Sequence, residues 1–122
     1  MILVDTSVWI DHLRSGNRRL ADLLNRVAVA THPMVIGELA CGNLNNRALF
    51  LSLIKSLPVV DLPTHDEVFF FIEQHNLMGR GIGFIDAHLM ASVALTSDCL
   101  LWTLDKRLNS IARDMELDCH VE

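Results

Sequence analysis

Short apolar runs alternate with longer segments of helical periodicity along the whole chain. Three of these runs, at residues 2–5, 27–31 and 99–103, are predicted strands, and shorter candidates lie at 58–62 and 117–121. Strands that alternate with helices in this way form a mostly parallel sheet. We therefore expect an α/β fold with a central parallel β-sheet flanked by helices.

Helices are predicted in the intervals between these strands. Thr6 or Ser7 can cap the first helix, and Pro33 suits the first turn of another. Thr64 and Glu67 have the spacing of a capping box. The apolar periodicity places the helices at about residues 8–13, 20–24, 33–41, 45–56, 64–78, 85–97 and 108–115.

The length and the apolar content set the expected number of domains. With 122 residues, of which 51% are hydrophobic, the chain can bury one core but not two. We expect a single domain over residues 1–122. No basic segment precedes the first apolar residues, so no secretory signal is expected. The apolar stretch at 89–104 is interrupted by polar side chains and does not fit a membrane span.

The cysteines indicate the compartment of the protein, and the net charge limits how it could bind nucleic acid. Cys41, Cys99 and Cys119 form an odd set with no close pair, which argues against a disulfide framework and predicts a reducing, cytoplasmic compartment. The net charge of -5 argues against a broad basic surface that grips nucleic acid. It fits a nuclease whose phosphate contacts run through bound metal ions.

Four acidic residues are the candidate site. Asp5 and Asp105 each follow a predicted strand, and in open α/β sheets the ligand site lies beyond the carboxyl ends of the strands. Asp86 begins a predicted helix, where the helix dipole favours its ionised form, and a loop with three glycines precedes it. Glu38 lies on a helix between the two strand ends. Such carboxylates repel one another, and a hard divalent cation, Mg²⁺ or Mn²⁺ rather than zinc, is the usual compensation.

These residues stand in motifs that resemble a known family. The motifs are Val4 to Ile10, Gly37 to Leu39, Gly81 to Leu89 and Thr103 to Asp105. In this order and spacing they resemble the PIN-domain ribonucleases, and within them the VapC-type toxins of toxin-antitoxin pairs. The resemblance spans essentially the whole chain.

The resemblance implies a PIN-like nuclease domain with a metal-binding and catalytic quartet at Asp5, Glu38, Asp86 and Asp105. Thr6 and Thr103 would assist as hydroxyl groups beside it. The implied activity is Mg²⁺- or Mn²⁺-dependent endoribonuclease hydrolysis of phosphodiester bonds in RNA. The implied partners are a cognate VapB-type antitoxin, which blocks the acidic site, and a second copy of the chain in a homodimer.

Two other functions remain as alternatives. A non-catalytic PIN-fold interaction module would keep the fold for assembly, although the retention of all four acids counts against it. A phosphotransfer domain would also place an Asp after the first strand. Ser7 stands where one such fold needs a second Asp, and the acidic pair of receiver domains is missing.

Other conspicuous residues receive structural interpretations. Surface roles are expected for Asp11 and His12, and packing or a hydrogen bond for His88. Buried positions are expected for Trp9 and Trp102, and at least partial burial for the run 69–72. Solvated positions near the crevice are expected for Arg80, Lys106 and Arg107, with RNA or partner contacts as the second interpretation.

Overall fold

The computed structural model describes residues 1–120 and contains a three-stranded parallel sheet in the order β2-β1-β3. The central strand β1 (Ile2–Val4) pairs with β2 (Val29–Ala30) and β3 (Leu100–Trp102). Leu3 lies opposite Ala30 on one side and Leu101 on the other. The expected α/β fold with a central parallel sheet is therefore confirmed.

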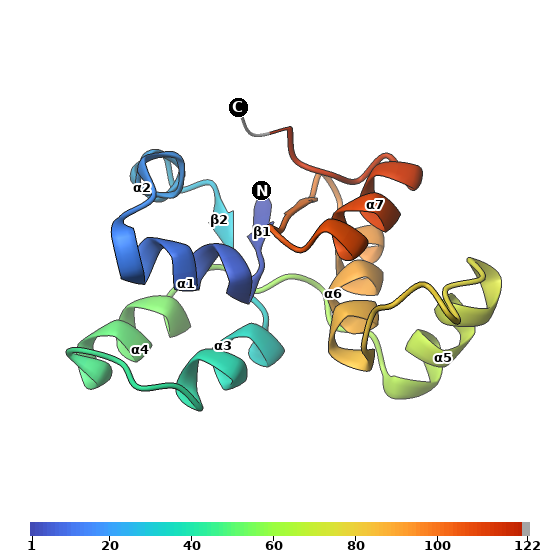
Figure 1. Cartoon of the computed structure of the whole chain (residues 1–122), viewed down its shortest axis with the longest axis horizontal. Coiled ribbons are helices and arrows are strands. Elements are labelled where there is room, and N and C mark those ends of the chain that lie inside the picture. The colour runs from blue at the N-terminus through green and yellow to red at the C-terminus, as the bar shows by residue number, and fades with distance from the viewer. Residues whose placement is uncertain (121–122) are drawn as a thin grey trace.

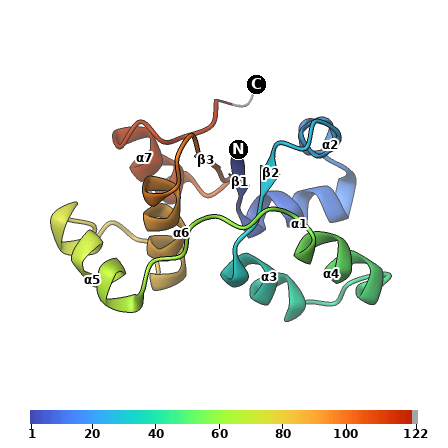
Figure 2. The ribbon, with the colours of Figure 1, turned by 180° about the vertical axis from the view of Figure 1, so that it is seen from behind.

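Seven helices surround the sheet within the described residues. The helices α1 (Thr6–Ser15), α2 (Arg18–Asn25), α3 (Pro33–Ala40) and α4 (Arg47–Lys55) lie on one side of it (Figures 1 and 2). The helices α5 (His65–Gln74), α6 (Phe84–Leu95) and α7 (Lys106–Asp114) lie on the other side. Every predicted helix is present, with its ends shifted by a few residues.

The two shorter strand candidates are wrong as strands. The segment 58–62 contributes a single bridge between Thr31 and Val59, and the segment 117–121 contributes one between Leu101 and Asp118. Pro58 has no N–H to donate to a neighbouring strand, and its carbonyl oxygen accepts a hydrogen bond from Thr31 N. Val121, at the end of the second candidate, lies outside the described residues.

The start of α1 also differs from the expectation. Asp5, in extended conformation, is the N-cap residue, and its Oδ1 accepts a hydrogen bond of 2.7 Å from Thr6 N. Thr6 and Ser7 are already helical, so neither caps the helix. The capping box of α5 is confirmed, since Thr64 Oγ1 accepts from Glu67 N and Glu67 Oε1 accepts from Thr64 N.

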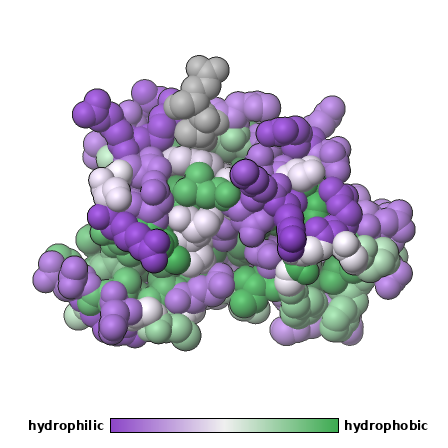
Figure 3. Space-filling view, in the orientation of Figure 1, coloured by the Kyte–Doolittle hydropathy of each residue, from purple (hydrophilic) through white to green (hydrophobic). Residues whose placement is uncertain are grey.

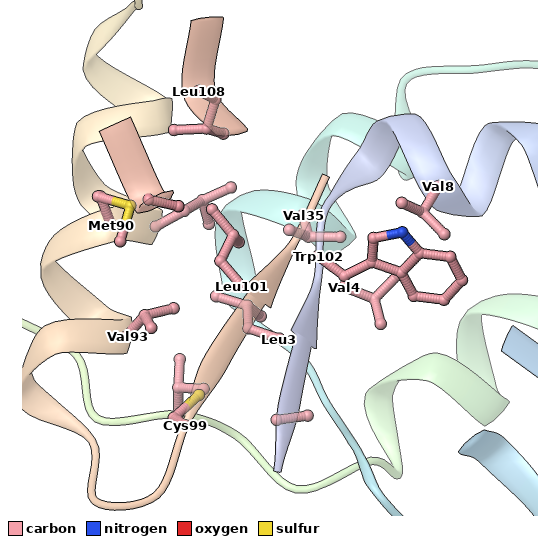
Figure 4. Close-up of a cluster of buried hydrophobic side chains, with 14 of the residues drawn as sticks. Leu3, Val4, Val8, Val35, Met90, Val93, Cys99, Leu101, Trp102 and Leu108 are labelled. Atoms are coloured by element: carbon pink, nitrogen blue, oxygen red, sulfur yellow. The ribbon is translucent and has the colours of Figure 1, made fainter. Parts of the chain in front are cut away.

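The core lies on both faces of the sheet (Figure 4). Leu3, Val4 and Leu101 are fully buried, and Trp9 and Trp102 are buried as expected. The apolar run on α5 divides by helical position, because residues three or four apart share a face of a helix and adjacent residues do not. Val68 and Phe71 are therefore buried against α6, whereas Phe69 and Phe70 are 54% and 67% exposed. The run 69–72 is thus partly buried, as expected, through Phe71 and Ile72.

Two further expectations bear on the environment of the chain. All three cysteines are free thiols, which agrees with the absence of a disulfide framework. Within residues 1–120, each helix is too short or too polar to cross a lipid bilayer.

Candidate functional site

Asp5 is the buried centre of the site. It follows β1 at the carboxyl end of the sheet and is only 6% exposed. Its Oδ2 accepts hydrogen bonds of 2.9 Å from Ser7 Oγ and 2.6 Å from Thr103 Oγ1. With the bond from Thr6 N to Oδ1, three donors hold this carboxylate. Its orientation is therefore set by the fold.

Thr103 joins Asp5 to Asp105. Thr103 follows β3, and its Oγ1 accepts a hydrogen bond of 3.1 Å from Asp105 N while donating to Asp5. Asp105 caps α7, because its Oδ1 accepts from the backbone N–H groups of residues 107 and 108 at 2.9 and 3.0 Å. One hydroxyl group thus positions both of the acids that follow strands.

Thr6 joins Asp5 to Glu38 in the same way. Its backbone N–H donates to Asp5, and its Oγ1 donates a hydrogen bond of 2.9 Å to Glu38 Oε1. Glu38 lies exposed on α3, which packs beside α1. The packing of these two helices therefore carries Glu38 to the carboxyl edge of the sheet.

Asp86 lies in the first turn of α6, where its Oδ2 accepts a hydrogen bond of 3.1 Å from Gly83 N. Burial raises the pKa of this carboxyl group, the Gly83 hydrogen bond opposes the rise, and the negative charges of Asp5 and Asp105 add to it. The helix dipole was expected to favour the ionised form, and burial acts in the opposite direction. The repulsion identifies Asp5, Asp86 and Asp105 as electrostatic neighbours.

The four acids share a chemical property that suits a hard cation. Within residues 1–120 none of them forms an ion pair, and hydrogen bonds reach only one oxygen each of Glu38, Asp86 and Asp105. Oxygen ligands of net negative charge are those that Mg²⁺ and Mn²⁺ prefer. In the same residues no three His, Cys, Asp or Glu side chains form a group that could hold a metal ion. The donor chemistry thus fits the cation. Asp5, Glu38 and Asp105 are linked through hydroxyl groups, Asp86 is hydrogen-bonded only to Gly83 N among the described residues, and the four are not closed into a coordination shell.

Arg107 is a cationic side chain that packs against the loop leading to Asp86. It follows Asp105 on α7, and its side chain lies against Gly81 in the loop before α6. A Cβ on Gly81 would approach Arg107 Cδ to 2.7 Å and Nη1 to 3.0 Å. Arg80 in the same loop forms an ion pair of 3.0 Å with Asp114. The ion pair therefore ties the loop that leads to Asp86 to α7, and Arg107 packs against the same loop.

One residue of the site was missed at the sequence level. Ser7 donates to Asp5 Oδ2 and accepts a hydrogen bond of 3.0 Å from Leu104 N. It thereby ties the first turn of α1 to the segment after β3. Its sequence position two residues after Asp5 suggested only a cap, because the partner at Leu104 is brought close by strand pairing alone.

The histidines serve the scaffold around the site. Of the two roles expected for His88, the structure shows packing: its buried ring lies edge-on against Phe84 and His65 with centroids 4.7 and 5.0 Å apart, and within residues 1–120 its Nε2 has no hydrogen-bond partner. His32 caps α3, since its Nδ1 accepts from Met34 N at 3.0 Å and its Nε2 lies 3.0 Å from Ser92 Oγ. Burial, with the nearby His88, lowers the pKa of His32 to about 4.

Asp11 and His12 lie away from the quartet contacts, as expected. Asn17 donates to both, from Nδ2 to Asp11 Oδ2 at 3.1 Å and from its backbone N–H to His12 Nδ1 at 2.9 Å. These bonds hold the turn between α1 and α2. Neither residue has a hydrogen bond to the four acids within the described part of the chain.

Comparison with known proteins agrees with this architecture. Residues 2–114 match the PIN domain family. The chain is 48% identical to Ribonuclease VapC32 of Mycobacterium tuberculosis over 110 residues, in two strains, covering 90% of this chain and 89% of the relative. The crystal structure of PAE2754 from Pyrobaculum aerophilum superposes with a TM-score of 0.62 at 23% identity, covering 90% of this chain and 83% of that one. This last likeness concerns the fold alone.

Proposed function

The chain belongs to the PIN domain family, and from this premise we propose that it is a divalent-metal-dependent endoribonuclease, the toxin of a toxin-antitoxin pair. The ribonuclease activity is that named for VapC32, with which the chain shares 48% identity over nine-tenths of its length. The metal would be Mg²⁺ or Mn²⁺, and the ligands would be Asp5, Glu38, Asp86 and Asp105. Three free cysteines fit an enzyme of the reducing cytoplasm.

The observation that carries this proposal is the pair of threonine bridges. Thr6 links Asp5 to Glu38, and Thr103 links Asp5 to Asp105. Asp5 and Asp105 also cap helices, but helix capping alone does not explain why the exposed Glu38 of α3 is joined to the acids that follow β1 and β3. Burial raises the pKa of Asp86, and the charges of Asp5 and Asp105 add to the rise, as expected for carboxylates that lie near one another.

The residues have separable roles in phosphodiester hydrolysis. A divalent cation supplies an acidified water and charge stabilisation at the departing oxygen. Asp5, held by three donors, would be the fixed ligand, and the free oxygens of Glu38, Asp86 and Asp105 would complete the oxygen donor set. Thr6 and Thr103 would orient the carboxylates of Glu38 and Asp5, because their hydroxyl groups donate hydrogen bonds to them. Arg107, seated on Gly81, would bind a phosphate of the RNA backbone.

An antitoxin is the proposed protein partner. An apolar groove of about 340 Å³ runs between α1, α2 and α4. It is lined mainly by apolar side chains such as Trp9, Phe50 and Ile54, and Leu53 at its edge is 59% exposed. Figure 3 shows apolar surface over the region of α4. An apolar helix in this groove would bring a following basic segment to the acidic site, where it would take the place of the cation's charge.

A second copy of the chain is the other proposed partner. Phe69 and Phe70 project from α5, and Phe69 stacks on Phe84 with ring centroids 5.2 Å apart. Exposed aromatic pairs of this kind are enriched in protein interfaces. Light scattering of the wild type and of Phe70→Glu tests the assignment, because a dimer through this face would dissociate in the variant.

The decisive experiment is digestion of total RNA by the purified chain with Mn²⁺, followed by sequencing of the new ends. Discrete cuts are expected with Mn²⁺ and none with EDTA or with Asp5→Asn. Asp11→Asn is the matched control, since it removes the same charge from a carboxylate that serves only the α1–α2 turn. Cuts that persist in EDTA and in Asp5→Asn would refute the metal-dependent site, and intact RNA with all proteins would refute the ribonuclease.

A further inference from the structure

A second pocket opens directly beside Glu38. It encloses about 400 Å³ between α1, the C-terminal part of α3 and the following loop. Its apolar walls come from both helices and the loop, and its polar groups are a carboxylate, a guanidinium and two amides. The residues that carry the argument are Ile10, Leu13, Arg14, Glu38, Asn43 and Asn45.

The pocket is continuous with the acidic site along one face of α1. Thr6, Ile10 and Leu13 are spaced at four and three residues, so their side chains lie in one row. Thr6 at the start of this row donates to Glu38, and Arg14 stands near its far end. At 1.5 Å of rise per residue, the row from Thr6 to Arg14 is about 12 Å long. This length suits one or two nucleotides beyond a phosphate held at the cation that Glu38 would ligate.

The outer wall of the pocket is a fastened loop. The Arg47 guanidinium donates hydrogen bonds to the carbonyl oxygens of Ala40 and Gly42. These bonds tie the segment 42–46 to the end of α3. Within residues 1–120 the side-chain amides of Asn43 and Asn45 have no hydrogen-bond partner, and both residues are exposed. The segment 42–46 therefore holds the free side-chain amides of Asn43 and Asn45 on a backbone that Arg47 fixes to α3.

We propose that this pocket binds the nucleobase of the nucleotide next to the scissile phosphate and so sets the cleavage preference. The inference rests on the proposed ribonuclease function. Ile10 and Leu13 would cover the apolar face of the base, and Asn43 and Asn45 would pair with its edge, since each amide offers a donor and an acceptor. Arg14 would bind the next phosphate.

The chemistry of the walls favours a base over a protein side chain. The neighbouring groove between α1, α2 and α4 is almost wholly apolar, which fits a partner helix. The pocket beside Glu38 mixes apolar side chains with two unpaired amides and an arginine. A flat heterocycle with a polar edge and an adjoining phosphate satisfies all of these groups at once, whereas an aliphatic side chain would leave the amides buried without partners.

The test is cleavage of a single-stranded RNA library that is randomised around the cut, with sequencing of the ends. The variants are Asn43→Ala with Asn45→Ala, and Ile10→Trp, which fills the pocket at a position that is 38% exposed. The double amide variant is expected to cut with its base preference at the flanking position reduced by about 10-fold, since amide pairing to a base discriminates on this scale. Ile10→Trp is expected to raise KM more than it lowers kcat.

The control variant is Asn25→Ala, which removes an exposed amide from the end of α2. It should keep the wild-type base preference. A wild-type chain that cuts no RNA would refute the proposed function itself. A wild type that cuts, with unchanged base preference in the amide variant and in Ile10→Trp, would overturn the pocket assignment alone. Loss of antitoxin affinity with unchanged base preference would do the same and assign the pocket to the protein partner.

Discussion

Thr103 Oγ1 donates a hydrogen bond of 2.6 Å to Asp5 Oδ2 across a sequence separation of 98 residues. The two residues follow the neighbouring parallel strands β3 and β1, so the register of these strands sets the bond. Thr103 is 6% exposed, and its hydroxyl group also accepts from Asp105 N. This side chain therefore supports two of the four acids at once.

Replacement of Thr103 by Val should impair both stability and activity. The change keeps the shape but removes the donor to Asp5 and the acceptor for Asp105 N. A hydrogen bond to a charged group contributes about 1.5 to 3 kcal/mol, and a loss of that size is expected in urea unfolding. Thr103→Ser keeps the hydroxyl group and should retain most RNA cleavage. Equal cleavage by Thr103→Val and the wild type would show that the bond does not serve the site.

Removal of the charge at Glu38 should reduce RNA cleavage without unfolding the chain. Glu38 is exposed, and Gln keeps an oxygen that can accept from Thr6 Oγ1. Loss of one transition-state stabilising group lowers kcat by on the order of 100-fold. The measurement is single-turnover cleavage at saturating Mn²⁺. Asp86→Asn and Asp105→Asn should show losses of the same order, and wild-type rates in all three variants would remove the quartet from the mechanism.

The contribution of Asp86 to metal binding can be measured by thermal unfolding, without an activity assay. Burial and the charges of Asp5 and Asp105 raise the pKa of Asp86, so its ionised form destabilises the metal-free fold. Asn at this position still offers an oxygen to Gly83 N. In EDTA, Asp86→Asn should therefore melt at the wild-type temperature or above it. Mn²⁺ at about a hundred times its Kd should stabilise the wild type by roughly 2.7 kcal/mol and the variant much less.

Asp5→Asn provides the contrast in the same thermal measurement. Asp5 accepts hydrogen bonds from three donors, and an amide cannot serve all of them. The variant should be less stable than the wild type in EDTA by about 1 to 3 kcal/mol. An Asp5→Asn chain that gains as much stability from Mn²⁺ as the wild type would assign Asp5 to the scaffold alone.

Arg107 should contribute to RNA affinity through one phosphate. Arg107→Gln is expected to weaken binding of a labelled single-stranded RNA in EDTA and to make the slope of log K against log salt shallower by about 0.7. Gly81→Ala should act in the same direction, because its Cβ would meet Arg107 Cδ at 2.7 Å. Arg113→Gln, farther along α7, is the control. An unchanged salt slope in Arg107→Gln would exclude the phosphate contact.

His32 should make the stability of the fold depend on pH. Its Nδ1 accepts from Met34 N, so the neutral ring carries its proton on Nε2 and donates to Ser92 Oγ. Its pKa of about 4 in the folded chain lies below the ordinary 6.5. Between these values the unfolded chain binds a proton that the folded chain does not. Stability is therefore full above about pH 6.5 and falls as the pH drops toward 4.

The measurement for His32 is urea unfolding at pH 7.5 and pH 4.5. The wild type should lose on the order of 2 kcal/mol from this residue over that range. His32→Asn keeps a capping side chain and should lose less, while His75→Asn, at an exposed position, should behave like the wild type. A pH dependence in His32→Asn equal to that of the wild type would contradict the assignment.

The local sequence determined the elements and the identity of the acids. Alternation of apolar runs with segments of helical periodicity predicted the parallel sheet and all seven helices. The capping box at Thr64 and Glu67 could be predicted because its two residues are only three positions apart. Asp5 and Asp105 were predicted at strand ends for the same reason. The family motifs around them indicated which acids belong together, but not how they meet.

Tertiary structure alone decided how those acids are held. Ser7 donates to Asp5 and accepts from Leu104, and Thr103 reaches Asp5 only through the pairing of β1 with β3. Arg107 lies against Gly81, and Arg80 ties the same loop to Asp114 of α7, through side chains that lie far apart in the sequence. The sequence pattern records which face of an element is apolar, since that follows from a period of two or 3.6 residues. The partner of a polar side chain depends on which distant segment packing brings within about 3 Å, and no local period carries that information.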